Sequence, residues 1–174
     1  TNTDPTKTRH FPKFRWPRIP NPRVEFPVTP ESTARVAAAE AEALSAIEAV
    51  IAGEGDDVAA LIIEPIQGEG GDNHFRGEFL RALRAICDEH EILMIVDEVQ
   101  AGLGITGSWW AYQNFGFEPD LLAFGKKMQV CGCLASKRLD DVENVFKVSS
   151  RINSTWGGYL VDMVRAQAYI EVIA

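Results

Sequence analysis

A lysine and an aspartate each follow an apolar run of this chain, and together they could bind a carbonyl compound. Lys126 comes shortly after the run 121–124, and Asp97 directly follows the run 92–96. A lysine at the end of a buried strand is partly desolvated, which favours the neutral amine and its attack on a carbonyl carbon. An aspartate at the end of a neighbouring strand could face that amine across a cleft.

One chemical arrangement uses both groups. It is a Schiff base between the lysine and pyridoxal phosphate, with the aspartate keeping the pyridine nitrogen protonated. The pyridinium ring then accepts electrons and stabilises a carbanion. In the alternative interpretation, Lys126 and its neighbour Lys127 are solvated, and Asp97 only ends a strand. Spacing alone favours this second interpretation.

The elements that must position these groups alternate between helices and apolar strands. Thr29 and Pro30 are typical of a helix start, and an apolar stripe that includes Val36 and Ile47 recurs at helical spacing before Gly53. The run 58–63 predicts a strand covered on both faces. The other expected elements are a helix over 76–89, strands over 92–96, 121–124 and 133–136, short helices over 109–114 and 140–146, and a last helix from 159.

Strands separated by helices of this length predict right-handed βαβ units and a parallel sheet, so the expected fold class is α/β. Ligands bind at the carboxyl ends of the strands in such sheets. Glu64, Asp97, Glu98 and Lys126 are all expected at that edge. We interpret Glu64 as a residue that supports the site rather than one that performs chemistry.

The first 30 residues differ from the rest of the chain. They hold seven of the nine prolines, which exclude a continuous helix. We expect residues 1–30 to form an ordered, extended segment, with residues 31–174 forming the main body. The aromatic residues expected to pack this segment onto the body are Phe11, Phe14, Trp16 and Phe26.

Composition describes an ordinary globular chain of 174 residues, 46% apolar and 24% charged. Its net charge of −8 and its pI of about 4.9 argue against a nucleic-acid or anionic-membrane surface. No run approaches the roughly 18 apolar residues of a membrane span.

Three cysteines, two of them in Cys131-x-Cys133, suit a reducing compartment, so a cytoplasmic location is expected. The chain lacks an initiator methionine and ends within an apolar helical pattern, so we expect an internal piece of a longer protein.

Several stretches, in the family's order, resemble the class III, pyridoxal-phosphate-dependent aminotransferases. The core stretches are IIEPIQGEGGD, LMIVDEVQAGLGITG and PDLLAFGKK. The stretches RHFPKFRWPRIPNP, FGKKMQVCG and SSRINSTWGG are similar to the lysine-acting branch of that family. The resemblance covers essentially the whole chain. It implies that residues 31–174 form part of the large domain of a fold-type-I pyridoxal-phosphate-dependent transferase, with a mainly parallel sheet and flanking helices.

The resemblance also implies roles for individual residues. Lys126 would carry the cofactor as a Schiff base and shuttle a proton between the substrate carbon and the cofactor. Asp97 would pair with the pyridinium nitrogen, and Val99 would pack on the ring face. Gln100 would hydrogen-bond near the phenolic oxygen of the ring and the substrate. Thr155 would reach a cofactor phosphate in the neighbouring subunit's site, which implies a homodimer with shared active sites.

The implied reaction moves the ε-amino group of L-lysine to 2-oxoglutarate, giving glutamate and 2-aminoadipate 6-semialdehyde. Glu69 would mask an arginine during the first half-reaction and swing away for the dicarboxylate in the second. Its alternative role is that of a solvated loop acid. The family's phosphate-binding loop, the aromatic residue that stacks on the cofactor and both substrate-binding arginines are expected outside residues 1–174.

Other interpretations stay open. Another ω-aminotransferase, acting on ornithine or 4-aminobutyrate, would share these motifs, and a truncated remnant could persist as a non-catalytic binding module. Residues 102–107 satisfy a dinucleotide-binding pattern, but they begin six residues after Val96 and two carboxylates intervene. The cysteines and histidines lack metal-ligand spacing, so no metal site is expected. Met128, Cys133 and Tyr159 depart from the pattern of the lysine-acting branch.

Overall fold

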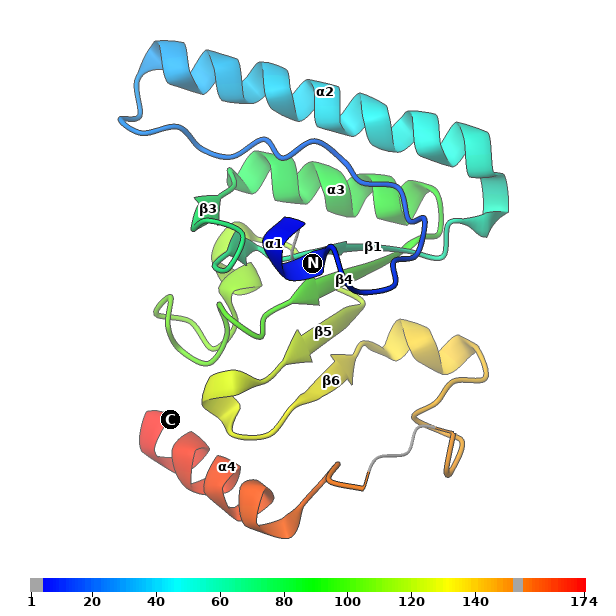
Figure 1. The fold of residues 1–174 in the computed structure, drawn as a ribbon, viewed down its shortest axis with the longest axis vertical. Coiled ribbons are helices and arrows are strands. Elements are labelled where there is room, and N and C mark those ends of the chain that lie inside the picture. The colour runs from blue at the N-terminus through cyan, green and yellow to red at the C-terminus, as the bar shows by residue number, and fades with distance from the viewer. Residues whose placement is uncertain (1–4, 152–154) are drawn as a thin grey trace.

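The computed structural model describes residues 5–151 and 155–174. Its centre is a four-stranded sheet with the strand order β1-β4-β5-β6 (Figure 1). These strands are β1 (Ala60–Ile63), β4 (Leu93–Asp97), β5 (Leu121–Phe124) and β6 (Gly132–Ala135). A small antiparallel hairpin follows β1 and consists of β2 (Ile66–Gln67) and β3 (Asn73–His74).

Strands β1, β4 and β5 are parallel, which confirms the predicted α/β class. Ile63 pairs with Val96, and Asp97 pairs with Ala123. Strand β6 differs from the predicted parallel sheet because it runs antiparallel to β5. The connection over 125–131 is too short for a parallel crossover, which needs about a dozen residues or more, so the chain can only turn back.

The long helices lie where the sequence predicts them, whereas the two short helices that it predicts are 3₁₀ turns with different bounds. The α-helices are α1 (Pro5–Thr8), α2 (Pro30–Glu54), α3 (Gly77–Glu89) and α4 (Leu160–Ile173). The 3₁₀ turns are η1 (Gly55–Asp57), η2 (Ala111–Phe115), η3 (Lys126–Met128) and η4 (Lys137–Asp141). The helix expected over 140–146 is wrong, since η4 ends at Asp141. Thr29 caps α2 as predicted: its hydroxyl accepts from the Ser32 N–H (3.1 Å), and the Ser32 hydroxyl accepts from the Thr29 N–H (2.8 Å).

Helices α2 and α3 lie together beside the β1 end of the sheet, and α4 lies near the β6 end, beside the turn after β5 (Figure 1). Met94 and Val96 of β4 are fully buried, and they belong to the same apolar cluster as Leu80 and Leu83 of α3. The prediction that the first strand is covered on both faces is wrong, because Ile62 is 50% exposed. The alternation of side chains turns Ile62 away from its more buried neighbours in β1. No described helix is both long and apolar enough to cross a membrane.

The aromatic side chains of the Pro-rich segment pack on the body less than predicted: among the described residues, only Phe26 makes a ring contact with it, edge to face on His74 (ring centroids 6.4 Å apart). Phe11, Phe14, Trp16 and Phe26 are each more than two-thirds exposed, and Phe14 and Trp16 stack on one another with ring centroids 4.9 Å apart. The segment attaches through Ile19, which packs against the main apolar cluster, and through backbone and polar groups. The Val24 N–H, for example, donates to the His74 carbonyl (2.8 Å).

Candidate active site

Three connecting segments start at the carboxyl edge of the sheet. Residues 64–72 follow β1, residues 98–110 follow β4, and the turn η3 follows β5. Because β1, β4 and β5 are parallel and adjacent, these segments leave the sheet side by side. The sheet therefore brings Glu64, Asp97, Glu98 and Lys126 to one edge, as the sequence predicts.

Gln100 connects all three segments. The Lys126 ammonium donates to the side-chain oxygen Oε1 of Gln100, and the Lys127 ammonium donates to the Gln100 backbone carbonyl. On the other side, a Cβ added to Gly68 would collide with Cγ of Gln100, so only glycine permits this approach. Gly68 directly precedes Glu69. The amide of Gln100 thus lies between the lysine turn and the loop that carries Glu69.

Asp97 and Lys126 are placed on neighbouring strands. Asp97 pairs with Ala123, which lies three residues before Lys126. Asp97 is half-buried, and its Oδ1 accepts from the Val99 N–H (3.1 Å), which fixes the orientation of the carboxylate. By the alternation along β4, Asp97 faces away from the core that holds Met94 and Val96.

The two lysines after β5 differ in burial, and the prediction of a partly desolvated Lys126 is wrong. Lys126 is exposed, whereas Lys127 is half-buried. Burial and the positive charge of Lys126 lower the pKa of Lys127, and Glu98 opposes both effects. Lys126 and Gln129 both have positive φ, at 47° and 65°. Such strain in non-glycine residues clusters at functional sites.

Glu69 and Thr155 are both exposed. The Glu69 carboxylate forms an ion pair with Lys7 of α1. Thr155 lies in the bend shortly before α4, and residues 152–154 of the SSRINSTWGG stretch lie outside the described residues. The roles assigned to Glu69 and Thr155 stay predictions.

Glu98 is a buried group for which the sequence suggested no role. Its side chain is 1% exposed, and its two carboxylate oxygens accept from the backbone N–H groups of Ala111 (2.9 Å) and Tyr112 (2.8 Å). Burial raises the pKa of Glu98, and these two hydrogen bonds oppose the rise. The signal was present in the sequence: inward positions recur at every second residue along β4, and the next one after Val96 is Glu98.

The aspartate of the Pro-Asp motif has a structural position at the opposite end of β5. Asp120 is 7% exposed, and its Oδ2 accepts from the Met94 N–H (2.8 Å) and from Arg84 Nη1 (2.7 Å). Arg138 lies 3.4 Å from the same oxygen. Burial raises the pKa of Asp120, but the hydrogen bonds from Met94 and Arg84 outweigh burial and leave it below its usual value. Asp120 therefore ties α3 to the sheet.

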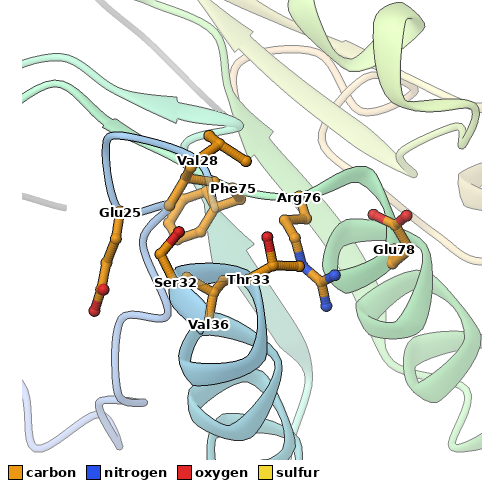
Figure 2. Close-up of a pocket in the computed structure, with 9 residues that line it drawn as sticks. Glu25, Val28, Ser32, Thr33, Val36, Phe75, Arg76 and Glu78 are labelled. Carbon is orange, nitrogen blue, oxygen red and sulfur yellow. The ribbon is translucent and has the colours of Figure 1, made fainter. Parts of the chain in front are cut away.

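Two hollows lie beside other parts of the fold. A hollow of about 320 Å³ lies between the N-terminal segment and the starts of α2 and α3, where Figure 2 shows Ser32, Val36, Phe75 and Arg76. The Arg76 guanidinium there already donates to Glu40 (2.8 Å), so it is not an open anion site. A wider hollow of about 740 Å³ separates α4 from Phe124 and the turn η3, and its lining is mainly apolar.

Comparison with known protein families gives a match over nearly the whole chain. Residues 2–174 match the family described as Aminotransferase class-III. An L-lysine-epsilon aminotransferase of Amycolatopsis lactamdurans is 55% identical over 174 residues, which are 99% of this chain and 38% of that protein. A 4-aminobutyrate aminotransferase of Emericella nidulans is 41% identical over 134 residues, which are 76% of this chain and 27% of that protein.

Solved structures agree with the sequence comparison. A lysine aminotransferase from M. tuberculosis in the internal aldimine form superposes with a TM-score of 0.92 at 54% identity, covering 99% of this chain and 39% of that chain. The chain therefore spans less than two fifths of the length of the relatives that it matches. The fold seen here is part of the α/β fold of the pyridoxal-phosphate-dependent aminotransferases.

Proposed function

Because this chain belongs to the class III aminotransferases, we propose that the whole protein moves the ε-amino group of L-lysine to 2-oxoglutarate with pyridoxal phosphate as cofactor. The products are glutamate and 2-aminoadipate 6-semialdehyde. Identity to an L-lysine-epsilon aminotransferase is higher and more extensive than identity to a 4-aminobutyrate aminotransferase, which favours lysine as the amine. The observation that carries the proposal is the contact of the Lys126 amine with Gln100, beside the strand that ends in Asp97.

The residues at this edge fit pyridoxal phosphate. The Lys126 amine is exposed to an incoming aldehyde, and the Asp97 carboxylate lies at the end of the adjacent strand. A Cβ on Gly125 would lie 2.9 Å from the Cys131 sulfur and 3.6 Å from Cγ1 of Val99, so the backbone before the lysine is packed closely against an apolar neighbour. When bound, the cofactor supplies an electron-accepting ring that stabilises negative charge on the substrate carbon.

The chain's own residues provide the proton chemistry and the orientation. Asp97 would hold a proton on the ring nitrogen, and the bond from the Val99 N–H keeps its carboxylate in place. Lys126 would anchor the cofactor and then act as the general base and acid at the substrate carbon. The Oε1 of Gln100 accepts from the Lys126 amine and thereby positions it. Val99 would lie against the ring face.

We assign Glu69 to the change of substrate between the two half-reactions. Its ion pair with Lys7 joins side chains that are 57% and 51% exposed, and such surface pairs contribute only about 0–1 kcal/mol. If Glu69 leaves Lys7 and pairs with an arginine elsewhere in the whole protein, the loss of the Lys7 pair therefore costs little free energy. This exchange would let Glu69 cover that arginine for lysine and release it for 2-oxoglutarate.

We further propose a cytoplasmic homodimer with shared sites, in which Thr155 reaches the neighbouring cofactor phosphate. Helix α4 follows Thr155 and is apolar on several sides, with Leu160 78%, Val164 67% and Val172 86% exposed. A helix of this kind is normally buried by further protein, which the rest of the polypeptide or a second subunit supplies. The three cysteines are free thiols, in keeping with a reducing compartment.

The test uses the full-length protein loaded with pyridoxal phosphate. L-lysine, L-ornithine and 4-aminobutyrate are added separately, and the cofactor absorbance is followed before and after adding 2-oxoglutarate. We expect lysine to convert the cofactor fastest, and 2-oxoglutarate to reverse the change. A faster response to ornithine or 4-aminobutyrate would replace the proposed substrate, and no response to any amine would support a non-catalytic module.

A further inference from the structure

The buried carboxylate of Glu98 lies between two residues that the proposed function places against the cofactor, Asp97 and Val99. It is 1% exposed, whereas Asp97 and Val99 are only half-buried. A carboxylate is removed from water at a large cost unless hydrogen bonds satisfy it. Here two successive backbone N–H groups, of Ala111 and Tyr112, each donate to one of its oxygens. This buried position therefore suits a side chain with two acceptor oxygens.

Glu98 holds both ends of the connection between β4 and η2. At the strand end, its own N–H donates to the Ala123 carbonyl of β5 (2.8 Å), which extends the sheet by one further contact. At the other end, its carboxylate holds the first residues of η2. Its carbonyl also accepts from the Gly102 N–H (2.9 Å), which closes a turn over residues 98–102.

The connection is folded tightly onto itself. A Cβ on Gly102 would lie 2.7 Å from the ring of Trp110 and 2.9 Å from the Glu98 carbonyl, so Trp110 packs directly on the turn. Val99 and Gln100 lie inside this turn. Gln100 accepts from both lysine amines through its side chain and its backbone carbonyl. A shift of the turn would therefore move the acceptors that position Lys126.

We propose that Glu98 is a positioning residue of the cofactor site: its carboxylate ties the end of β4 to the start of η2 and thereby sets the places of Val99 and Gln100 beside Lys126. This inference rests on the proposed function, because it concerns the site that function assigns. Glu98 acts through its neighbours and touches neither the substrate nor the reacting atoms.

The geometry predicts a sharp difference between a carboxylate and an amide at this position. Both partners of Glu98 are N–H donors, so both of its oxygens must accept. In Glu98→Gln, one oxygen becomes an NH₂ group that faces a backbone N–H, and a buried donor loses its acceptor. Glu98→Asp keeps both acceptors on a side chain shorter by one methylene, so it reaches the donors less well.

The experiment compares Glu98→Gln and Glu98→Asp with the wild type in the full-length protein, with Glu42→Gln on the exposed side of α2 as the matched control. The measurements are the dissociation constant of pyridoxal phosphate, the pH titration of the bound cofactor's absorbance, and thermal unfolding with and without cofactor. We expect Glu98→Gln to weaken cofactor binding about tenfold or more and to shift the titration midpoint, since loss of a hydrogen bond to a charged acceptor has effects of this order. Glu98→Asp should fall between Glu98→Gln and the wild type.

Two results would overturn the inference. In the first, Glu98→Gln unfolds at a lower temperature but binds and titrates the cofactor like Glu42→Gln, which would make Glu98 purely structural. In the second, which also decides the question if Glu98→Gln does not fold, Glu98→Asp unfolds at a lower temperature than the wild type but binds and titrates the cofactor like the wild type. If either result is found but the wild type binds the cofactor, the proposed function stays intact. A wild type that binds no cofactor would overturn both the proposed function and the inference about Glu98.

Discussion

Replacing Asp120 by asparagine is expected to lower the free energy of unfolding by about 2 kcal/mol. The carboxylate is buried and accepts from the Met94 N–H and from Arg84, whose side chain is only 12% exposed. Breaking a buried ion pair costs about 3–5 kcal/mol when the remaining charge is left without a partner. Arg84 keeps an ion pair with Asp88 (2.7 Å), and asparagine keeps an oxygen for the Met94 N–H, so we expect the lower figure of about 2 kcal/mol.

Asp88→Asn provides a matched control for this prediction. Asp88 pairs with the same Arg84 but is 63% exposed, and exposed pairs contribute about 0–1 kcal/mol. Both variants are compared with the wild type by urea unfolding of the full-length protein, followed by tryptophan fluorescence at pH 7. Equal losses in Asp120→Asn and Asp88→Asn would refute the reasoning, because burial would then have no influence on the strength of the pair.

The pH dependence provides a second check on Asp120. Its pKa is lower in the folded chain than in the unfolded chain, where an aspartate titrates near about 3.9. The stabilisation is therefore fully present above that value and is lost as the pH falls through the lower, folded pKa. The difference in stability between the wild type and Asp120→Asn should be constant from pH 7 to about pH 5 and should shrink below about pH 4. A difference that grows toward acid pH would contradict the assignment.

Three further variants test the site in the full-length protein. Gly68→Ala should lower kcat/KM for lysine about tenfold, since its Cβ displaces Gln100, while Gly70→Ala, which meets its nearest neighbour at 3.4 Å, should have a smaller effect; equal effects would contradict this. Asp97→Asn should lower kcat at least tenfold while changing the free energy of unfolding by no more than about 1 kcal/mol, and an unchanged kcat would exclude the proposed role of Asp97. Glu69→Gln should impair the half-reaction with 2-oxoglutarate differently from the half-reaction with lysine in single-turnover absorbance measurements, and equal changes in both would make Glu69 an ordinary loop acid.

Much of the fold follows from local patterns in the sequence. The helix start at Thr29 and the three parallel strands are found where capping and apolar periodicity predict them. The direction of β6 was missed because it depends on the length of the connection over 125–131 and not on the pattern of the strand itself. The exposure of Ile62 was missed because an apolar run shows that a strand suits a two-sided sheet, but not whether this chain supplies the second layer.

The candidate site was predicted unevenly for a similar reason. Residue order places Asp97 and Lys126 at one edge, because parallel strands end together. Which of the two lysines is buried depends on the backbone turn at Lys126, whose positive φ no pattern of apolar residues indicates. The central place of Gln100 depends on the close approach of Gly68, a contact between segments that are far apart in the sequence.

The most direct test of the whole account is borohydride reduction of the full-length protein with pyridoxal phosphate, followed by mass mapping of the labelled lysine. The account predicts that Lys126 carries the reduced cofactor and that Lys126→Ala abolishes the label, while Lys127→Ala retains it. A label on Lys127, or no labelled lysine at all, would contradict the claim that Lys126 anchors a carbonyl cofactor at this sheet edge.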